Sequence, residues 1–168
     1  IAKEYDIGYA SAGDILRAEA KDPNSKNGKE IAEFFSKGQL VPPALICQTI
    51  KNTIESSPQQ YFLMDGFPRS LEQDEEFCKI MPPCTAVAFL DAPDEVLIQR
   101  ITKRGLTSGR SDDKAEFIPQ RLEVYRAQTM PVIEKYRKEG KVFVVNSNQT
   151  IDAVKADFVA QLKKYWKI

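Results

Sequence analysis

The chain has 168 residues, 42% of them hydrophobic, and its 24 lysines and arginines balance its 24 aspartates and glutamates. That length suits one globular domain with its own core, and the zero net charge excludes a general attraction to nucleic acid or to membranes. The sequence contains 0 histidines, so it offers neither the usual general base nor a Ser-His or Cys-His nucleophile pair. Any catalysis must therefore rest on positioning and charge.

No apolar stretch approaches the ~20 residues of a membrane span, and the N-terminal sequence IAKEYDIGYA lacks a secretory apolar segment. Three cysteines, Cys47, Cys78 and Cys84, form no CxxC pair and indicate free thiols rather than a zinc site. The absence of interleaved basic and aromatic residues argues against a nucleic-acid-binding module. We therefore expect a cytoplasmic protein without nucleic-acid or membrane contacts.

Four short apolar runs alternate with helical patterns and are predicted to be strands, at residues 9–11, 61–64, 86–90 and 142–145. Strands that alternate with helices favour a parallel sheet. The run at 86–90 is apolar throughout, which is typical of a strand covered on both sides. The sequence thus predicts an α/β fold with a parallel sheet and helices on both faces.

Three helical patterns, at residues 14–21, 29–37 and 44–56, lie between the first two strands. The turn-rich sequences DPNSKNG and GQLVPP separate them. These patterns predict a helical insertion between two strands of the sheet.

A helix after the third strand is well marked, with Asp91 as its cap, Pro93 in its first turn and Gly105 at its end. The polar sequence GLTSGRSDDKAE follows and predicts a mobile flap. Two amphipathic helices complete the chain. The first carries Phe117, Ile118, Leu122, Tyr125 and Val132, and the last, at 151–166, carries Ile151, Val154, Phe158 and Leu162.

Six arginines are candidates for a binding site because of their positions in the sequence: Arg17, Arg69, Arg100, Arg104, Arg110 and Arg121. Each alone is typical of a solvated surface residue. Five of the six, however, adjoin turn-type residues or a predicted strand end, where loops build sites. Because arginine forks match phosphate oxygens in pairs, the set indicates a phosphate-rich ligand.

Four sequences occur in order: SAGDILR at residues 11–17, DGFPR at 65–69, KRGLTSGRSDD at 103–113 and RLEVY at 121–125. Together they resemble the short-lid nucleoside monophosphate kinases of the adenylate kinase and UMP/CMP kinase superfamily. The resemblance extends from Ile1 to the C-terminal helix. It implies a P-loop NTPase fold with core segments 1–10, 59–104 and 117–168, an NMP-binding insertion at 11–58 and a lid at 105–116.

The resemblance also implies roles at the acceptor site. Arg17 and Arg69 correspond to arginines that hold the acceptor monophosphate, and Gln73 corresponds to the side chain that reads its base. The backbone that lines this site comprises Gly66, Phe67, Pro68 and Arg69. From the residues alone, Gln73 is equally readable as an exposed helix residue, and Ser11 with Asp14 as a plain helix cap.

At the donor site the resemblance implies ATP and Mg²⁺. Arg104 corresponds to a donor contact, whereas Arg110 and Arg121 correspond to arginines of the lid and the following helix that clamp the phosphates during transfer. All three are expected to be catalytic. Arg100 corresponds to a residue that stacks on adenine. The backbone carbonyl of Gln149 corresponds to one that contacts the adenine of ATP, and Asp65 corresponds to an acid that orients the waters of a magnesium ion. Asp112 and Asp113 correspond to acids of the lid. Phosphoryl transfer needs cations and alignment more than a histidine base, which agrees with the composition.

The phosphate-binding loop of this superfamily, GxxxxGK[S/T], is not found in the 168 residues. IAKEYDIGYA resembles the end of the helix after that loop, so we expect roughly 25 residues upstream of Ile1. The resemblance places their strand between those ending at Met64 and Leu90, leaving a slot in the sheet. A non-catalytic relative or a fragment is the alternative, and we expect the 168-residue chain alone to be inactive.

Two positions disagree about the acceptor base. Ala12 stands where adenylate kinases usually carry threonine, and SAGD with KDPNS resembles UMP/CMP kinases. Gln73 favours AMP, because many UMP/CMP kinases have asparagine there. We expect a monomeric UMP/CMP kinase with some AMP activity, with an adenylate kinase as the alternative.

Overall fold

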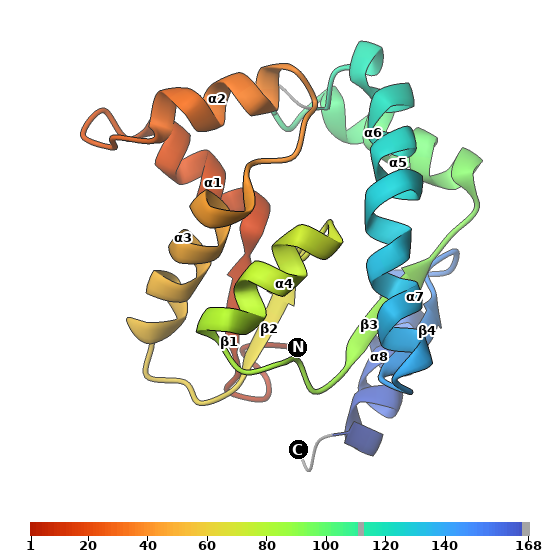
Figure 1. The fold of residues 1–168 in the computed structure, drawn as a ribbon. Coiled ribbons are helices and arrows are strands. Elements are labelled where there is room, and N and C mark those ends of the chain that lie inside the picture. The colour runs from red at the N-terminus through yellow and green to blue at the C-terminus, as the bar shows by residue number, and fades with distance from the viewer. Residues whose placement is uncertain (111–112, 166–168) are drawn as a thin grey trace.

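The computed structural model describes residues 1–110 and 113–165 as a chain in which strands alternate with helices (Figure 1). The predicted α/β class is confirmed. The elements in order are β1 (Gly8–Ser11), α1 (Ala12–Lys21), α2 (Gly28–Ser36), α3 (Pro43–Glu55), β2 (Phe62–Asp65), α4 (Leu71–Ile80), β3 (Val87–Asp91), α5 (Asp94–Gly105), η2 (Ala115–Phe117), α6 (Ile118–Val124), the π-helical η3 (Tyr125–Thr129), α7 (Met130–Lys138), β4 (Val142–Asn146) and α8 (Ile151–Tyr165).

The strands form two parallel pairs. β1 pairs with β2, with Gly8 opposite Phe62, and β3 pairs with β4, with Val87 opposite Val142. Within the described residues no strand is paired with the facing edges of β2 and β3. The strands of the described residues therefore form two separate parallel pairs instead of one continuous sheet.

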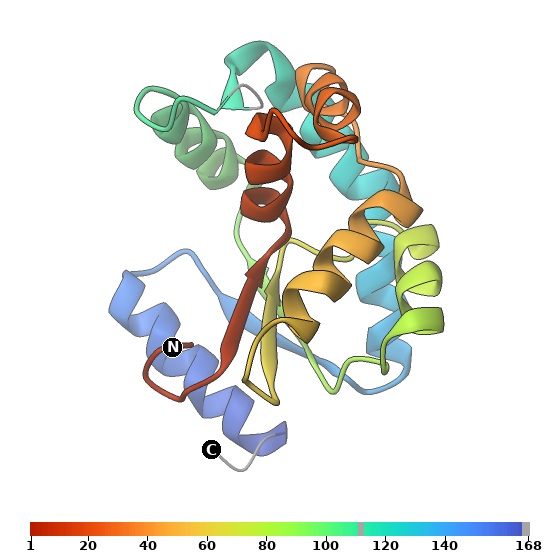
Figure 2. The same ribbon diagram turned by 90° about the vertical axis from the view of Figure 1, so that its left-hand side faces the viewer.

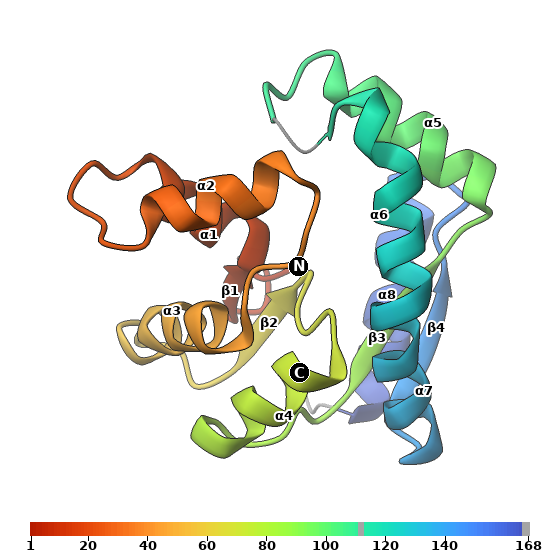
Figure 3. The ribbon, with the colours of Figure 1, turned by 45° about the horizontal axis from the view of Figure 1, so that its top comes forward.

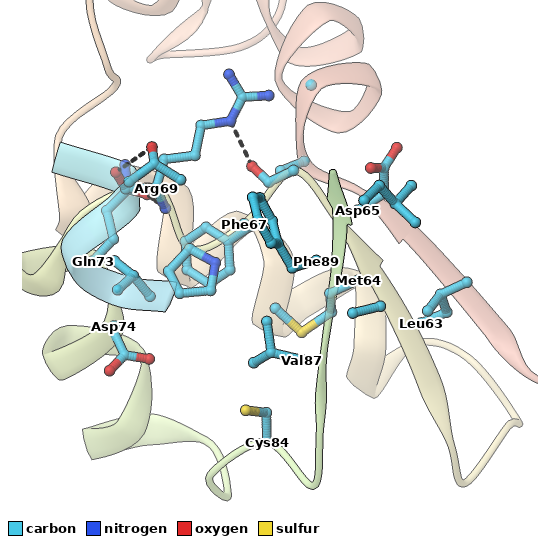
Figure 4. Close-up of a pocket in the computed structure, with 18 of the residues that line it drawn as sticks. Leu63, Met64, Asp65, Phe67, Arg69, Gln73, Asp74, Cys84, Val87 and Phe89 are labelled. Atoms are coloured by element: carbon cyan, nitrogen blue, oxygen red, sulfur yellow. Dashed lines mark hydrogen bonds between the residues drawn. The ribbon is translucent and has the colours of Figure 1, made fainter. Parts of the chain in front are cut away.

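A cavity of about 1350 Å³ occupies the space between β2 and β3. Its inner part is lined by apolar side chains, among them Met64 and Val87, as Figure 4 shows. Leu63 of β2 nevertheless packs against the core cluster of Phe143 and Val145 on β4. The two pairs thus belong to one layered structure that is open between β2 and β3.

The first core cluster joins the three helices between β1 and β2 to the turn after β2. Ile31, Ile50 and Leu16 are almost inaccessible, and each comes from a different helix of the set α1 to α3. Phe67 and Phe77 extend this core with an edge-to-face contact at 5.1 Å between ring centroids. Figure 2 shows β1 running directly into α1 at the base of this helical unit.

The second core cluster lies between the β3–β4 pair and α8. Phe143 and Val145 of β4 pack against Phe158 and Leu162 of α8, while α7 contacts the same strand pair and lies in front of it in Figure 1. Helices thus cover both faces, as predicted. Ile151 was predicted to join the apolar stripe, but it is 86% exposed because it begins the helix, and the packed stripe starts one turn later.

Helix α5 begins and ends slightly differently from the prediction. Asp91 is the last residue of β3 rather than the cap, and Pro93 takes the N-cap position rather than the first turn. Gly105 is the last helical residue, so it does not lie beyond the end of the helix. No helix in the described part of the chain is long and apolar enough to cross a membrane.

The predicted helix after the lid is a composite rod of α6, η3 and α7, which Figure 3 shows as one continuous column. Pro131 lies in the first turn of α7 and has no N–H to donate to the carbonyl of Ala127. This missing donor accounts for the interruption of the α-helical hydrogen-bond ladder by a π segment.

Candidate functional site

A tight turn connects β2 to α4 at the edge of the cavity. Gly66 has a φ of +70°, a backbone conformation that residues with a Cβ rarely adopt, so this position favours glycine. The Nε of Arg69 donates to the carbonyl of Gly66 at 2.7 Å. The hydroxyl of Ser70 caps α4 by accepting from the N–H of Gln73 at 3.2 Å. These bonds fix the turn that presents Arg69.

Gln73 is buried at 2% exposure, so it is not the exposed helix residue that the sequence left open as an alternative. Its Oε1 accepts from the N–H of Arg69 at 2.9 Å, a bond drawn in Figure 4. Its Nε2 donates to the carbonyl of Val41 at 3.1 Å. An amide group has two hydrogens and two acceptor lone pairs, so these bonds use half of its capacity.

Arg17 and Arg110 meet at one carboxylate, that of Asp14. Nη2 of Arg17 lies 2.5 Å from Oδ1 of Asp14, and Nη2 of Arg110 lies 3.2 Å from the same oxygen. The bond from Arg17 contributes most to lowering the pKa of Asp14 below its usual value. The predicted lid thereby contacts the first helix of the predicted insertion.

The carboxylate of Asp113 binds two further arginines. Arg104 donates to both of its oxygens, at 2.6 and 2.7 Å, and Arg121 donates to Oδ1 at 2.9 Å. Burial would raise the pKa of Asp113, but the two guanidinium groups outweigh it and lower the pKa to about 2. Asp112, the other predicted lid acid, lies outside the described residues.

The predicted adenine contacts lie beside β4, apart from this cavity. Nη2 of Arg100 donates to the carbonyl of Ser147 at 2.8 Å, next to the loop that contains Gln149. The side chain of Gln149 donates to Asp157 at 2.6 Å. The structure thus brings Arg100 and the segment of Gln149 to the carboxyl end of one strand, where open α/β sheets bind ligands.

Asp65 ends β2 and accepts a hydrogen bond from the hydroxyl of Tyr9 at 2.8 Å. Burial and this carboxylate raise the pKa of Tyr9. Among residues 1–110 and 113–165, no cluster of three or more Asp, Glu, Cys or His side chains could hold a metal ion. A single carboxylate still suits Mg²⁺, which keeps several waters and takes its other ligands from substrate phosphates.

The cavity brings together the predicted acceptor residues and part of the predicted donor set. Its lining includes Ala12, Arg17, Asp65, Gly66, Phe67, Pro68, Arg69, Gln73 and Arg121. Arg104 and Arg110 join this group through their shared carboxylates. Arginine side chains from three separate parts of the chain, Arg17, Arg69 and Arg121, therefore line one cavity, and the other two arginines are bound to carboxylates that they share with Arg17 and Arg121.

Four contacts at the site were not predicted. The i, i+3 spacing of Asp14 and Arg17 was a usable signal for their bond, but the approach of Arg110 to Asp14 had none. The sequence also offered no signal for the bond of Tyr9 to Asp65, or for that of Thr129 to the turn at Arg69, 60 residues away.

Comparison with known proteins agrees with this geometry. The family model described as adenylate kinase matches residues 1–141. The chain is 38% identical to an adenylate kinase of Phocaeicola vulgatus, over 98% of this chain and 89% of that protein. It is 39% identical to human adenylate kinase isoenzyme 1, over 92% and 80%, and 36% identical to a UMP-CMP kinase of Lentinula edodes, over 92% and 73%.

The chain belongs to the adenylate kinase family, and the predicted resemblance is confirmed. Its homologues are nucleoside monophosphate kinases whose names include both adenylate kinase and UMP-CMP kinase. Membership implies ATP as the phosphoryl donor, usually with Mg²⁺.

Proposed function

We propose that the protein transfers the terminal phosphoryl group of ATP to UMP or CMP, and more slowly to AMP. The observation that carries this proposal is the grouping of arginines around two carboxylates, Arg17 and Arg110 at Asp14 and Arg104 and Arg121 at Asp113, with one arginine of each pair, Arg17 and Arg121, lining the cavity. A transferring phosphoryl group develops negative charge over its oxygens, and such arginines are placed to stabilise it.

The acceptor monophosphate lies, in this proposal, between Arg17 and Arg69. Both side chains line the cavity, and the Arg69 turn is held by Gly66 and Gln73. An acceptor phosphate competes with Asp14 for the guanidinium of Arg17, because the phosphate offers more oxygens and more charge than a carboxylate. This exchange releases Arg110 toward the phosphates as well.

Arg104, Arg110 and Arg121 act on the donor and transferring phosphates. The buried carboxylate of Asp113 holds Arg104 and Arg121 in fixed orientation, so little reorganisation is needed when the phosphates enter. Arg100 and the carbonyl of Gln149 take the adenine of ATP. Asp65 would hold a magnesium ion through its waters, and such an ion would neutralise phosphate charge.

The acceptor base distinguishes two candidate functions. Ala12 is 2% exposed and supplies only a methyl group where a threonine would supply a hydroxyl, which favours UMP or CMP. Gln73 retains half of its hydrogen-bonding capacity beside the cavity, which favours AMP, as do the names of two of the relatives above. Adenylate kinase is therefore the second candidate.

The donor β- and γ-phosphates need a cradle of backbone amides and a lysine, and residues 1–168 contain no GxxxxGK[S/T] sequence. We propose that the 168-residue chain alone does not transfer phosphate. We also propose that the protein is a cytoplasmic monomer with free thiols, in keeping with the unpaired Cys47, Cys78 and Cys84.

The test is phosphoryl transfer from ATP to UMP, CMP and AMP, compared as kcat/KM in the protein with its native N-terminus. We expect UMP or CMP to lead and AMP to be a detectable, poorer acceptor. A preference for AMP above about a hundredfold, or about 2.7 kcal/mol, establishes the adenylate kinase candidate instead. Absence of transfer to all three acceptors refutes the enzyme and leaves a nucleotide-binding relative.

A further inference from the structure

The π segment η3 reaches across the cavity to the Arg69 turn. Oγ1 of Thr129, the last residue of η3, donates to the carbonyl of Arg69 at 2.9 Å. The bonds of Arg69 to Gly66 and Gln73 stay within the turn and the first turn of α4. The bond from Thr129 instead comes from a separate part of the fold and relates the turn to the rod of α6, η3 and α7.

The same rod carries Arg121, which is bound to the buried carboxylate of Asp113. The rod therefore contacts the predicted lid through Arg121 and the acceptor turn through Thr129. A π segment shifts the hydrogen-bond register of a helix, and such segments are frequent at functional sites. Here the π segment ends at the residue whose hydroxyl meets Arg69.

A second contact fixes the rod against α4. Asp74 is 3% exposed and accepts hydrogen bonds from the hydroxyl of Tyr136 at 2.6 Å and from Nζ of Lys135 at 2.5 Å. Burial and the carboxylate of Asp74 raise the pKa of Tyr136, so its hydroxyl stays a donor. Because these bonds hold α7 against α4, the hydroxyl of Thr129 keeps a fixed position relative to the Arg69 turn.

We propose that Thr129 is a positioning residue for the acceptor phosphate, which it affects through the backbone of Arg69. This inference rests on the proposed function. Loss of the hydroxyl frees the carbonyl of Arg69 from the rod and lets the guanidinium leave its orientation toward the acceptor. Donor binding is expected to be unaffected, because Arg104 and Arg121 stay bound to Asp113, and Arg100 and the segment of Gln149 lie beside β4.

The test compares Thr129→Val, which keeps the branched shape and removes the hydroxyl, with Thr129→Ser, which restores it. Thr53→Val is the matched control, since its hydroxyl also donates to a backbone carbonyl, at 3.0 Å, but within α3 and away from the cavity. The protein with its native N-terminus is used. Three quantities are measured: the KM for UMP and for ATP, the Kd of UMP by calorimetry without ATP, and amide exchange over residues 66–73.

Thr129→Val is expected to raise both the KM and the Kd for UMP by about 2- to 10-fold, the range for one neutral hydrogen bond, with the KM for ATP unchanged. Amide hydrogen exchange over residues 66–73 becomes faster in Thr129→Val. Thr129→Ser behaves like the unmodified protein, and Thr53→Val changes none of the three measured quantities.

The inference is overturned if Thr129→Val leaves the KM and Kd for UMP unchanged, or raises the KM for ATP as much as that for UMP. It is also overturned if Thr129→Ser fails to restore UMP binding. Each of these results leaves the kinase assignment in place. If the unmodified protein neither binds nor phosphorylates any monophosphate, the proposed function falls and the inference falls with it. If Thr129→Val does not fold, as its thermal transition would show, Thr129→Ala is measured in its place, with the same expected and contradicting results.

Discussion

Replacing Asp113 by asparagine should destabilise the protein and remove part of the pH dependence of its stability. The pKa of Asp113 is lowered from 3.8 to about 2 by Arg104 and Arg121, despite its burial. That difference corresponds to about 2 kcal/mol. Because the folded-state pKa lies below the unfolded value, this contribution is complete above about pH 4 and is lost as the pH falls through 2. Asparagine keeps the shape but leaves the two arginines without their shared negative charge.

The assay is urea-induced unfolding at pH 7 and at steps down to pH 2.5. Asp113→Asn should lose about 2 kcal/mol at pH 7, equivalent to roughly 4–8 °C in Tm for a chain of this size, and its stability should fall less steeply below pH 4. Glu134→Gln is the control, since Glu134 forms an exposed pair with Arg137 and such pairs contribute about 0–1 kcal/mol. Equal stability of Asp113→Asn and the unmodified protein at pH 7 refutes this account of the carboxylate.

Three further changes test other parts of the structure. Arg69→Ala should cost about 2–4 kcal/mol of transition-state stabilisation without unfolding the protein, measured as kcat/KM for the monophosphate, and an unchanged value contradicts its role. Ala12→Thr should shift the ratio of kcat/KM toward AMP by up to about tenfold, and a shift toward UMP contradicts the assignment of the pocket. Asp74→Ala should lower the free energy of unfolding, measured by urea-induced unfolding, by about 3 kcal/mol, because it removes buried hydrogen bonds to a charged group. A loss under about 1 kcal/mol shows that Tyr136 and Lys135 find other partners.

Local sequence signals predicted the strand that leads into the Arg69 turn. A buried apolar run followed by an acid indicated β2 and its end, whereas the cap of α4 by Ser70, which accepts from the N–H of Gln73, was not predicted. The four predicted strands and the helices between them were likewise found within a few residues, because their apolar periodicity is strong.

Contacts between distant segments could not be predicted in the same way. Nothing near Asp14 in the sequence indicates that Arg110 shares its carboxylate, since that bond depends on how the predicted lid lies over α1. The burial of Gln73 depends on Val41, 32 residues earlier, and the π segment depends on hydrogen bonds that a single proline alters. Side-chain composition gives the chemistry of the site, whereas its geometry follows from tertiary packing.

A crystal structure of the protein with its native N-terminus, bound to uridine and adenosine joined by a five-phosphate chain, tests the central claim most directly. The account predicts that the phosphate nearest the uridine lies between Arg17 and Arg69, that Arg17 and Arg110 have exchanged Asp14 for phosphate oxygens, and that Arg104 and Arg121 contact the chain while Asp113 still holds them. Phosphates bound elsewhere, with Arg17 and Arg110 still paired to Asp14, would contradict it.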